Sequence, residues 1–424
     1  MLRQQFASRS LLIRGLGLTI AGSCLLVLTV GFQAEVPTAP FVAVKVSPAA
    51  LPCRQFGAGV CAQLQAQEGN LVFSPLSAWS SLAMAYAGAR GSTAEAMAGA
   101  LSIAAGPGDA HEQFGKLLSD LRAAASAEGC ELRIANAAWL QQGIVPKADF
   151  IRTLTEAYGA EIAHADFVRS PEDASAQVNR WVSLKTNGKL GGVLEPGDLN
   201  EWTRLVLANA IYFKGQWASR FPIGETRPET FHVSEARRVQ VQMMHQTGAF
   251  LYAESEGMQA LVVPYKGNRL AMVVVLPSQA EVGRHVEHQE LGVPDAEKWL
   301  EKLRLHEVDV SFPRFSIRAR MDLEPVLRSL GMGVAFDSRR ADFSGIAGAP
   351  GDLFVQKVVQ GALIEVDEEG TTAAAATAVG IGCSASAPLP PATFTADRPF
   401  RCAIIDIVSG LSLFEGRLSD PRSQ

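Results

Sequence analysis

The feature that most constrains the fold is a low-complexity segment at residues 367–391, which reads DEEGTTAAAATAVGIGCSASAPLPP. Consecutive alanines ordinarily favour a helix, but this tract follows the β-prone run FVQKVVQGALIEV and continues into Gly, Ser and Pro. A linker to a final domain is the alternative, but we expect the stretch from ATFTADRPF onward to be too short for a domain. The segment is therefore predicted to be a long exposed loop that returns to the same core, and such loops are usually functional.

The remaining segments divide into an early helical part and a later β part. Hydrophobic periodicity predicts helices over residues 77–91, 110–126, 171–186 and 322–331, and strands over 131–140, 203–213, 239–244, 260–265, 270–277, 308–317, 354–366 and around 402–415. This order indicates an α+β architecture. No internal repeat is visible and no linker interrupts residues 50–418, so one large domain is expected over residues 51–420.

The first 34 residues have the pattern of an export segment. Arg3, Arg9 and Arg14 precede an uncharged apolar stretch over residues 15–34, which is typical of a signal peptide. The stretch is also long enough for an uncleaved membrane anchor, and a lipid anchor at Cys24 is a third possibility. Residues 35–50 are interpreted as an extended linker. We therefore expect a protein that is secreted, or attached to the outer face of a membrane through its N-terminus.

Composition excludes several classes of protein. The chain has 424 residues, of which 48% are hydrophobic and 19% charged, with a net charge of −5, so it can bury a large core and is a poor candidate for nucleic-acid binding. Its six cysteines form no CxxC pair, which argues against a zinc or thioredoxin-like site. Buried thiols are the default interpretation, and a Cys53–Cys130 or Cys53–Cys61 bridge stays open.

The sequence contains none of the common enzyme signatures. A G-x-S-x-G elbow, a Walker loop and an H-E-x-x-H motif are all missing. His285 and His288 lie in a polar run, HVEHQE, that is better explained as a solvated face than as a metal site. Ser74, before Pro75, is interpreted as a helix N-cap or a core hydroxyl. We expect no enzymatic activity, no catalytic residues, no metal and no cofactor.

Four segments, in order along the chain, resemble the serpin family of protease inhibitors. They are NLVFSPLSAWSSLAMAYAGARGSTAEAM, TNGKLGGVLEPGDLNEWTRLVLANAIYFKGQW, VDEEGTTAAAATA and FTADRPFRCAII. The resemblance extends over roughly residues 50–418. It implies the serpin fold: a single large domain with a central mixed β-sheet, further sheets, surrounding helices and an exposed reactive-centre loop at about residues 370–396.

In this resemblance the loop is cleaved by its target and then enters the central sheet as a new strand. Glu368 and Glu369 mark the start of the hinge, and Gly370 gives it backbone freedom. Alternate residues of a strand share one face, so one set of small residues would be buried in the sheet: Thr371, Ala373, Ala375 and Thr377. A charge there would cost several kcal/mol, and its absence favours an inhibitory member.

The resemblance also assigns residues to the place where the sheet opens. Ser74 and Asn209 match the family's shutter, and Trp217 matches the breach, where insertion begins. Gln360 stands where the family often has a shutter histidine, which would alter a buried hydrogen bond. Family spacing puts the reactive bond at Ser384-Ala385, with Cys383-Ser384 as the alternative.

The implied function is that of a suicide-substrate inhibitor, which traps its target as a covalent acyl-enzyme complex. Small residues at the reactive bond indicate an elastase-like or subtilisin-like serine protease, with cysteine proteases left open. The alternative is a non-inhibitory serpin-fold protein that acts as a binding module or is cleaved as a substrate. We expect a monomer without a nucleic-acid partner.

Overall fold

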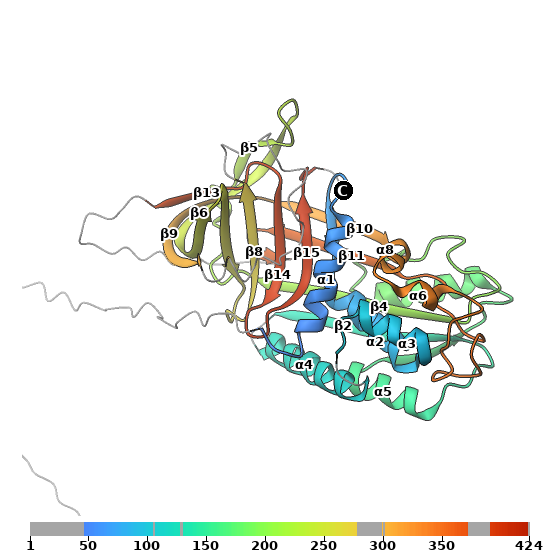
Figure 1. Cartoon of the computed structure of the whole chain (residues 1–424). Coiled ribbons are helices and arrows are strands. Elements are labelled where there is room, and N and C mark those ends of the chain that lie inside the picture. The colour runs from blue at the N-terminus through green and yellow to red at the C-terminus, as the bar shows by residue number, and fades with distance from the viewer. Residues whose placement is uncertain are drawn as a thin grey trace, which may run out of the picture. The chain divides into compact units, whose positions relative to one another are not determined.

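The structure is a computed structural model that describes residues 46–104, 107–127, 130–277, 299, 302–371 and 391–422. Helices dominate the first part of it. Their bounds are α1 Leu51–Leu64, α2 Pro75–Gly88, α3 Gly91–Ala100, α4 Pro107–Ala127, α5 Ala148–Tyr158, α6 Pro171–Lys185, η1 Ile223–Glu225, α8 Glu324–Ser329 and η4 Met332–Phe336. Figure 1 shows α2, α3, α5 and α6 gathered at the end of the domain away from β13.

A six-stranded mixed sheet forms the centre of the molecule. In spatial order its strands are β10 Phe315–Asp322, β11 Val359–Asp367, β12 Gly370–Thr371, β4 Leu205–Gln216, β2 Glu131–Gln141 and β3 Glu161–Ala165. All neighbours are antiparallel except β2 and β3. Because β12 is antiparallel to both of its neighbours, β11 and β4 run in the same direction and begin at the same end of the sheet.

The second sheet has nine strands. They are β1 Leu71–Phe73, β15 Leu411–Leu418, β14 Phe400–Asp406, β8 Leu270–Pro277, β7 Met258–Pro264, β6 Arg238–Ser255, β9 Arg304–Pro313 and β13 Ala392–Thr395, with β5 Arg227–His232 pairing to β6. Only β13 and β9 are parallel. The main hydrophobic core includes side chains from both sheets and from α1, α2 and α4.

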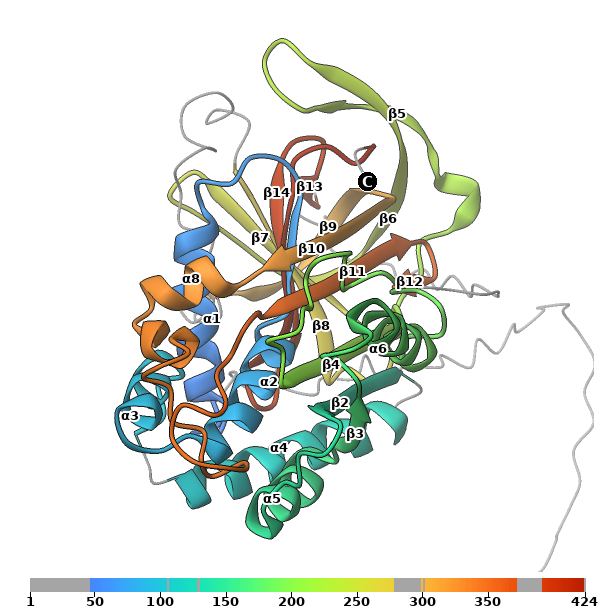
Figure 2. The same ribbon diagram turned by 90° about the vertical axis from the view of Figure 1, so that its right-hand side faces the viewer.

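Strand β4 has helices against both faces because its side chains alternate. Ile211 and Phe213 point into the main core with the buried helix α2, whereas Ala208 and Ala210 pack beneath α6, with Val178 and Val182. Figure 2 shows α6 lying over β4 and β2. An added strand beside β4 would therefore lie between a helix layer and the core.

The α+β architecture and most predicted elements are confirmed, with corrections at several boundaries. The predicted helix 77–91 is two helices, because α2 ends at Gly88 and Gly91, at φ 50°, begins α3. The run 308–317 is divided between β9 and β10, and the C-terminal run is divided between β14 and β15. The helix predicted at 322–331 is only α8, followed by Gly331 at φ 98°.

The N-terminal prediction concerns mostly residues outside the described part, since residues 1–45 are not described. At the end of the predicted linker, the Ser47 amide donates to the Ser409 carbonyl at 2.9 Å, and Ala50 is fully buried before α1. Packing of the domain therefore begins a few residues before 51. Among the helices that the structure describes, none is long and apolar enough to cross a bilayer.

The cysteines in the described residues are Cys53, Cys61, Cys130 and Cys402, all buried, and no disulfide joins them. Neither bridge left open by the sequence is formed, and the expectation of buried thiols is confirmed for these four. Burial raises the pKa of Cys402 to about 12. Such thiols are unreactive at neutral pH.

Candidate functional site: the strand gap and the loop hinge

The predicted hinge begins inside the six-stranded sheet. Strand β12 contains only Gly370 and Thr371, yet it pairs with Asp367 and Val366 of β11 on one side and with Gln216 and Gly215 of β4 on the other. In the described part of the chain, β12 is the only element that connects β11 and β4. The remainder of the space between these strands is called the strand gap below.

Gly370 is required by the closeness of the neighbouring strand. Its φ is 151°, and a Cβ atom at this position would lie 2.0 Å from the carbonyl oxygen of Gly215. Any side chain would push the two strands apart. The sequence-based reason for Gly370, backbone freedom, is therefore only part of the explanation.

Two glutamates before Gly370 are held by arginines. Glu368 is 5% exposed, and both of its carboxylate oxygens accept from the Arg314 Nε at 2.8 Å, while Thr226 donates to one of them. Burial raises the pKa of Glu368, but the Arg314 and Thr226 bonds outweigh burial and the pKa lies below its ordinary value. Arg220 pairs with Glu369 at 2.8 Å. Both glutamates at the start of the hinge are thus held by arginines, and Glu368 is ionised at neutral pH.

Trp217 contacts the hinge directly. Its indole Nε1 donates to the Asp367 carbonyl at 2.9 Å, and its backbone amide donates to the Glu369 carbonyl at 2.8 Å. The indole stacks on Tyr265, with ring centroids 4.6 Å apart, and the Tyr265 hydroxyl bonds the Thr371 hydroxyl at 2.7 Å. The structure therefore places Trp217 at the end of the strand gap where a new strand would start.

Ser74, Asn209 and Gln360 meet in one buried polar cluster. Ser74 is the N-cap of α2: its hydroxyl accepts from the Ser77 amide at 3.1 Å and donates to the Leu413 carbonyl at 2.6 Å. Gln360 accepts from the Ser74 amide and donates to the Ser74 carbonyl, both at 2.9 Å. Glutamine at 360 thus satisfies two backbone groups at the start of α2.

The cluster continues through two residues that were not predicted, Ser77 and Asn136. The Ser77 hydroxyl donates to Asn209, the Asn209 amide donates to Asn136, and Asn136 donates to the Tyr158 carbonyl at 3.0 Å. Polar side chains thus link β11, α2, β4 and β2. Ser77 follows the N-cap by three residues, which is the one local signal that sequence reasoning could have used.

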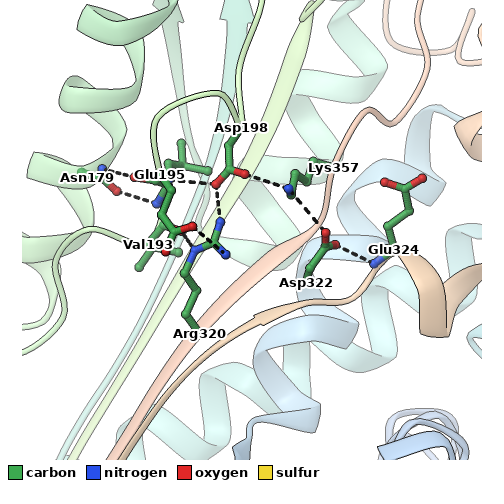
Figure 3. A network of polar contacts seen from close by, with 9 residues as sticks. Asn179, Val193, Glu195, Asp198, Arg320, Asp322, Glu324 and Lys357 are labelled. Carbon is green, nitrogen blue, oxygen red and sulfur yellow. Dashed lines mark hydrogen bonds and ion pairs between the residues drawn. The ribbon is translucent and has the colours of Figure 1, made fainter.

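A charged network fastens the segment between α6 and β4 to the opposite side of the strand gap (Figure 3). Asp198, 7% exposed, is its hub: it pairs with Arg320 of β10, and with Lys357, just before β11, at 2.7 Å. Lys357 also lies 3.4 Å from Asp322, and the Arg320 Nε donates to the Val193 carbonyl at 2.9 Å. We call Asp198, Arg320 and Lys357 the clasp.

The clasp covers a cavity between α6 and the strands. Side chains of α6, β4 and the 193–199 segment line it together with Val359 of β11, and its volume is about 30 Å³. That is space for roughly two water molecules. A strand occupies ~4.8 Å of sheet width, so β4 and β11 must separate, and the segment over them must shift, before one can be added.

The other predicted site residues lie outside the described part of the chain: Ala373, Ala375 and Thr377 of the hinge, and Cys383, Ser384 and Ala385 at the reactive bond. Their roles stay predictions. Within the described residues, no group of three or more His, Cys, Asp or Glu side chains is arranged to hold a metal ion.

The segment that holds the predicted hinge thus begins between two strands of the central sheet, with its two glutamates held by arginines. A family model described as Serpin (serine protease inhibitor) matches residues 53–421. The chain belongs to the serpin family, whose members are protease inhibitors rather than catalytic enzymes.

Individual relatives agree with this assignment. An uncharacterized serpin-like protein of Thermococcus kodakarensis is 39% identical over 365 residues, covering 85% of this chain and 83% of the relative. The leukocyte elastase inhibitor of Equus caballus is 37% identical over 360 residues, covering 83% and 93%. Among solved structures, Serpin48 of the insect Tenebrio molitor superposes with a TM-score of 0.77 at 32% identity, covering 88% of this chain and 98% of that one.

Proposed function

We propose that the protein is a suicide-substrate inhibitor of a serine endopeptidase and that it acts by adding its cleaved loop to the six-stranded sheet. The observation that carries the proposal is β12, because Gly370 and Thr371 already occupy the first two positions of a strand between β11 and β4. The protease hydroxyl attacks the carbonyl of Ser384, the Ser384–Ala385 bond breaks, and Ala385 leaves with a free amine. The loop residues then follow β12 into the strand gap.

The register of β12 supports this path. In antiparallel pairing, each further loop residue meets the preceding residue of β11 and of β4. Starting from Thr371 opposite Val366 and Gly215, this places Ala373 between Ile364 and Phe213, and Ala375 between Ala362 and Ile211. All four partners are buried in the main core, so small apolar side chains suit these positions.

The same register brings the loop to the buried polar cluster. Thr377 would arrive opposite Gln360 and Asn209, where its hydroxyl finds amide groups to bond. A hydroxyl is thus expected at the one core-facing position of the run whose neighbours are polar. In this register the apolar loop residues meet apolar side chains of β11 and β4, and the Thr377 hydroxyl meets polar ones.

The proposal is tested by incubating the protein with an elastase-like and a subtilisin-like serine protease. We expect a covalent complex that survives denaturing electrophoresis, because the acyl bond forms before hydrolysis can finish. A broad panel of serine and cysteine proteases that gives only clean cleavage would contradict the inhibitor function and favour a non-inhibitory serpin-fold protein. Mutating the protease serine to alanine is the control and should abolish the adduct.

We further propose that the target has a small specificity pocket. Ser384 at the reactive bond, or Cys383 in the alternative, is a small residue, and the relative from Equus caballus is named an elastase inhibitor. Mass spectrometry of the released C-terminal fragment identifies the cleaved bond, because the fragment begins at Ala385 if Ser384–Ala385 is cut and at Ser384 if Cys383–Ser384 is cut. A fragment that begins elsewhere would contradict both assignments.

We also propose that the N-terminal segment directs export and that the mature protein is a monomer. The support for export is the apolar stretch over residues 15–34, which follows three arginines. Expression of the full chain, followed by N-terminal sequencing of the material in the medium and in the membrane fraction, separates a cleaved signal from an anchor. Light scattering of the purified protein gives its oligomeric state.

A further inference from the structure

A second concave site lies at the other end of the six-stranded sheet from β12. Three loops line it: one follows β2, one precedes β4, and one over residues 338–354 leads towards β11. Together they form an open cleft of about 760 Å³. Clefts of about 300–1,000 Å³ are typical of small-molecule sites. Because β4 and β11 both begin at this end, the cleft is separate from the hinge.

Arg204 supplies a charged group with unused donors. It lies in the wall of the cleft directly before β4, and its Nη1 donates to the carbonyls of Glu201 at 2.8 Å and Thr203 at 3.0 Å. Neither Nε nor Nη2 of Arg204 bonds any described residue, and no described carboxylate pairs with it. The backbone bonds therefore hold the guanidinium in place while its other edge can bind an anion.

Arginines outnumber carboxylates at the cleft. Asp352 lines it and carries a negative charge, and its carboxylate is oriented by the Ala349 amide, which donates to it at 2.8 Å. Arg339 and Arg340 follow the lining residue Ser338 and are exposed, and within the described residues neither forms an ion pair. A negatively charged ligand therefore meets a favourable field here.

An apolar surface lies beside Arg204. Trp202 is 64% exposed and Val145 is 82% exposed, and both line the cleft together with Ile144, Leu353 and Phe354. An exposed indole offers a flat face on which a ring can stack. Because Arg204 and Trp202 line the same cleft, a ligand that contacts both carries its charge on an apolar body.

We propose that this cleft binds a small molecule that carries a carboxylate on a flat apolar body. The carboxylate pairs with the free edge of Arg204, and the apolar body lies against Trp202 and Val145. A concave site of this volume, lined by three loops, suits a small molecule.

The probe for this site is 2-naphthoate, titrated into the full-length protein by calorimetry, with the neutral 2-naphthamide as its matched ligand. We expect saturable one-to-one binding of the naphthoate and at least tenfold weaker binding of the amide. Arg204→Met should weaken naphthoate binding at least tenfold, because charged hydrogen bonds contribute about that much. Arg238→Met, at an exposed arginine on β6, is the control and should bind like the unmodified protein.

A second variant guards against loss of the loop conformation in Arg204→Met. The Trp202 side chain makes no hydrogen bond in the described residues and is mostly exposed, so Trp202→Ala should fold normally and bind naphthoate at least ~3-fold more weakly. The proposal is overturned if naphthoate shows no saturable binding at millimolar concentration. Equal binding of naphthoate and naphthamide, or unchanged binding in both variants, also overturns it.

Discussion

At the scale of single residues, the walls of the strand gap are shaped by small and closely packed side chains. Ala362 of β11 and Ile211 of β4 are 1% and 2% exposed. One residue before Ala362 in β11, Gly361 lies so close to Val193 that a Cβ atom added to Gly361 would be 2.8 Å from a methyl group of Val193. A loop residue that enters here meets apolar walls, with no described carboxylate to pair with a cation.

This packing predicts the effect of a charge in the loop. Ala375→Arg should turn the inhibitor into a substrate: cleavage continues, but the yield of covalent complex falls at least about tenfold, because burying an unpaired guanidinium costs several kcal/mol. Gel electrophoresis of the reaction with the target protease measures the ratio of complex to cleaved chain.

Thr372→Arg is the matched control for that change. In the register of β12, residue 372 turns to the opposite face of the sheet, between the half-buried Glu365 and Lys214. It should keep most of the complex yield, because Glu365 and solvent are near. Equal yields for the Ala375→Arg variant and the unmodified chain would contradict the insertion path.

At the scale of elements, helices α4 and α5 are joined by a buried histidine. His111 is 5% exposed, its Nδ1 bonds the Tyr158 hydroxyl at 2.6 Å, and its ring lies near Tyr86 of α2. Burial lowers the pKa of His111 to about 4, so the ring is neutral in the folded protein. The unfolded chain, with an ordinary histidine pKa, binds the proton more readily between pH 4 and 6.5.

Stability should therefore fall as the pH falls through this window. The neutral ring contributes fully to the free energy of unfolding above about pH 6.5, and about 3 kcal/mol of this free energy is lost by pH 4. His111→Gln keeps a partner for Tyr158 but does not titrate, so urea unfolding at pH 7 and pH 4 should show a smaller loss for it. His164→Gln, at an exposed site, should retain the full loss; identical pH profiles for all three proteins would contradict this role for His111.

The clasp is the second element-scale device. Burial raises the pKa of Asp198, but bonds from Lys357, the Glu195 amide and Arg320 outweigh burial, so the group is ionised at neutral pH. Asp198→Asn should free the segment between α6 and β4 and speed thermal loss of inhibitory activity roughly fivefold or more, as expected for one or two kcal/mol. Glu195→Gln removes only a 3.4 Å contact of an exposed residue and should change little. Equal half-lives of activity for all three proteins would contradict the role of the clasp.

Local sequence patterns predicted the helices and strands better than they predicted the breaks between them or the residues of the clasp. In the run 308–317, apolar residues continue on both sides of Pro313 and Arg314, where the chain passes from one sheet to the other, so apolar periodicity alone does not mark the break. Ser74, Asn209 and Trp217 were found because they lie in segments that resemble the family, and Gln360 because it stands where the family often has a histidine. Asp198, Arg320 and Lys357 are single charged residues, far apart in sequence, and only folding brings them together.

At the scale of the whole molecule, the six-stranded sheet is incomplete. β12 uses only the last two positions of β11, and residues 359–365 have no partner strand on that side among the described residues. Filling the gap would add a dozen or so backbone hydrogen bonds, each worth about 1 kcal/mol net. Under the proposed function, this difference makes the uncleaved form a kinetically trapped state.

Cleavage within residues 380–386 should therefore raise the melting temperature sharply, by roughly 20 °C or more given 2–4 °C per kcal/mol for a large domain. Scanning calorimetry before and after limited proteolysis measures it. Cleaved Ala375→Arg protein should show little of this rise. A nicked unmodified chain that melts where the intact one does would contradict the strained-sheet model.

The loop's two ends are built into different sheets: Thr371 pairs within the six-stranded sheet, and Ala392 begins β13 beside β9 in the nine-stranded one. An intact loop is thus held at both ends. Under the proposed function, its first part enters the six-stranded sheet only after the chain has been cut. Under the proposed function each molecule can respond once and cannot be reset. The amount of protein made, rather than the tightness of any one encounter, then sets how much protease it can remove.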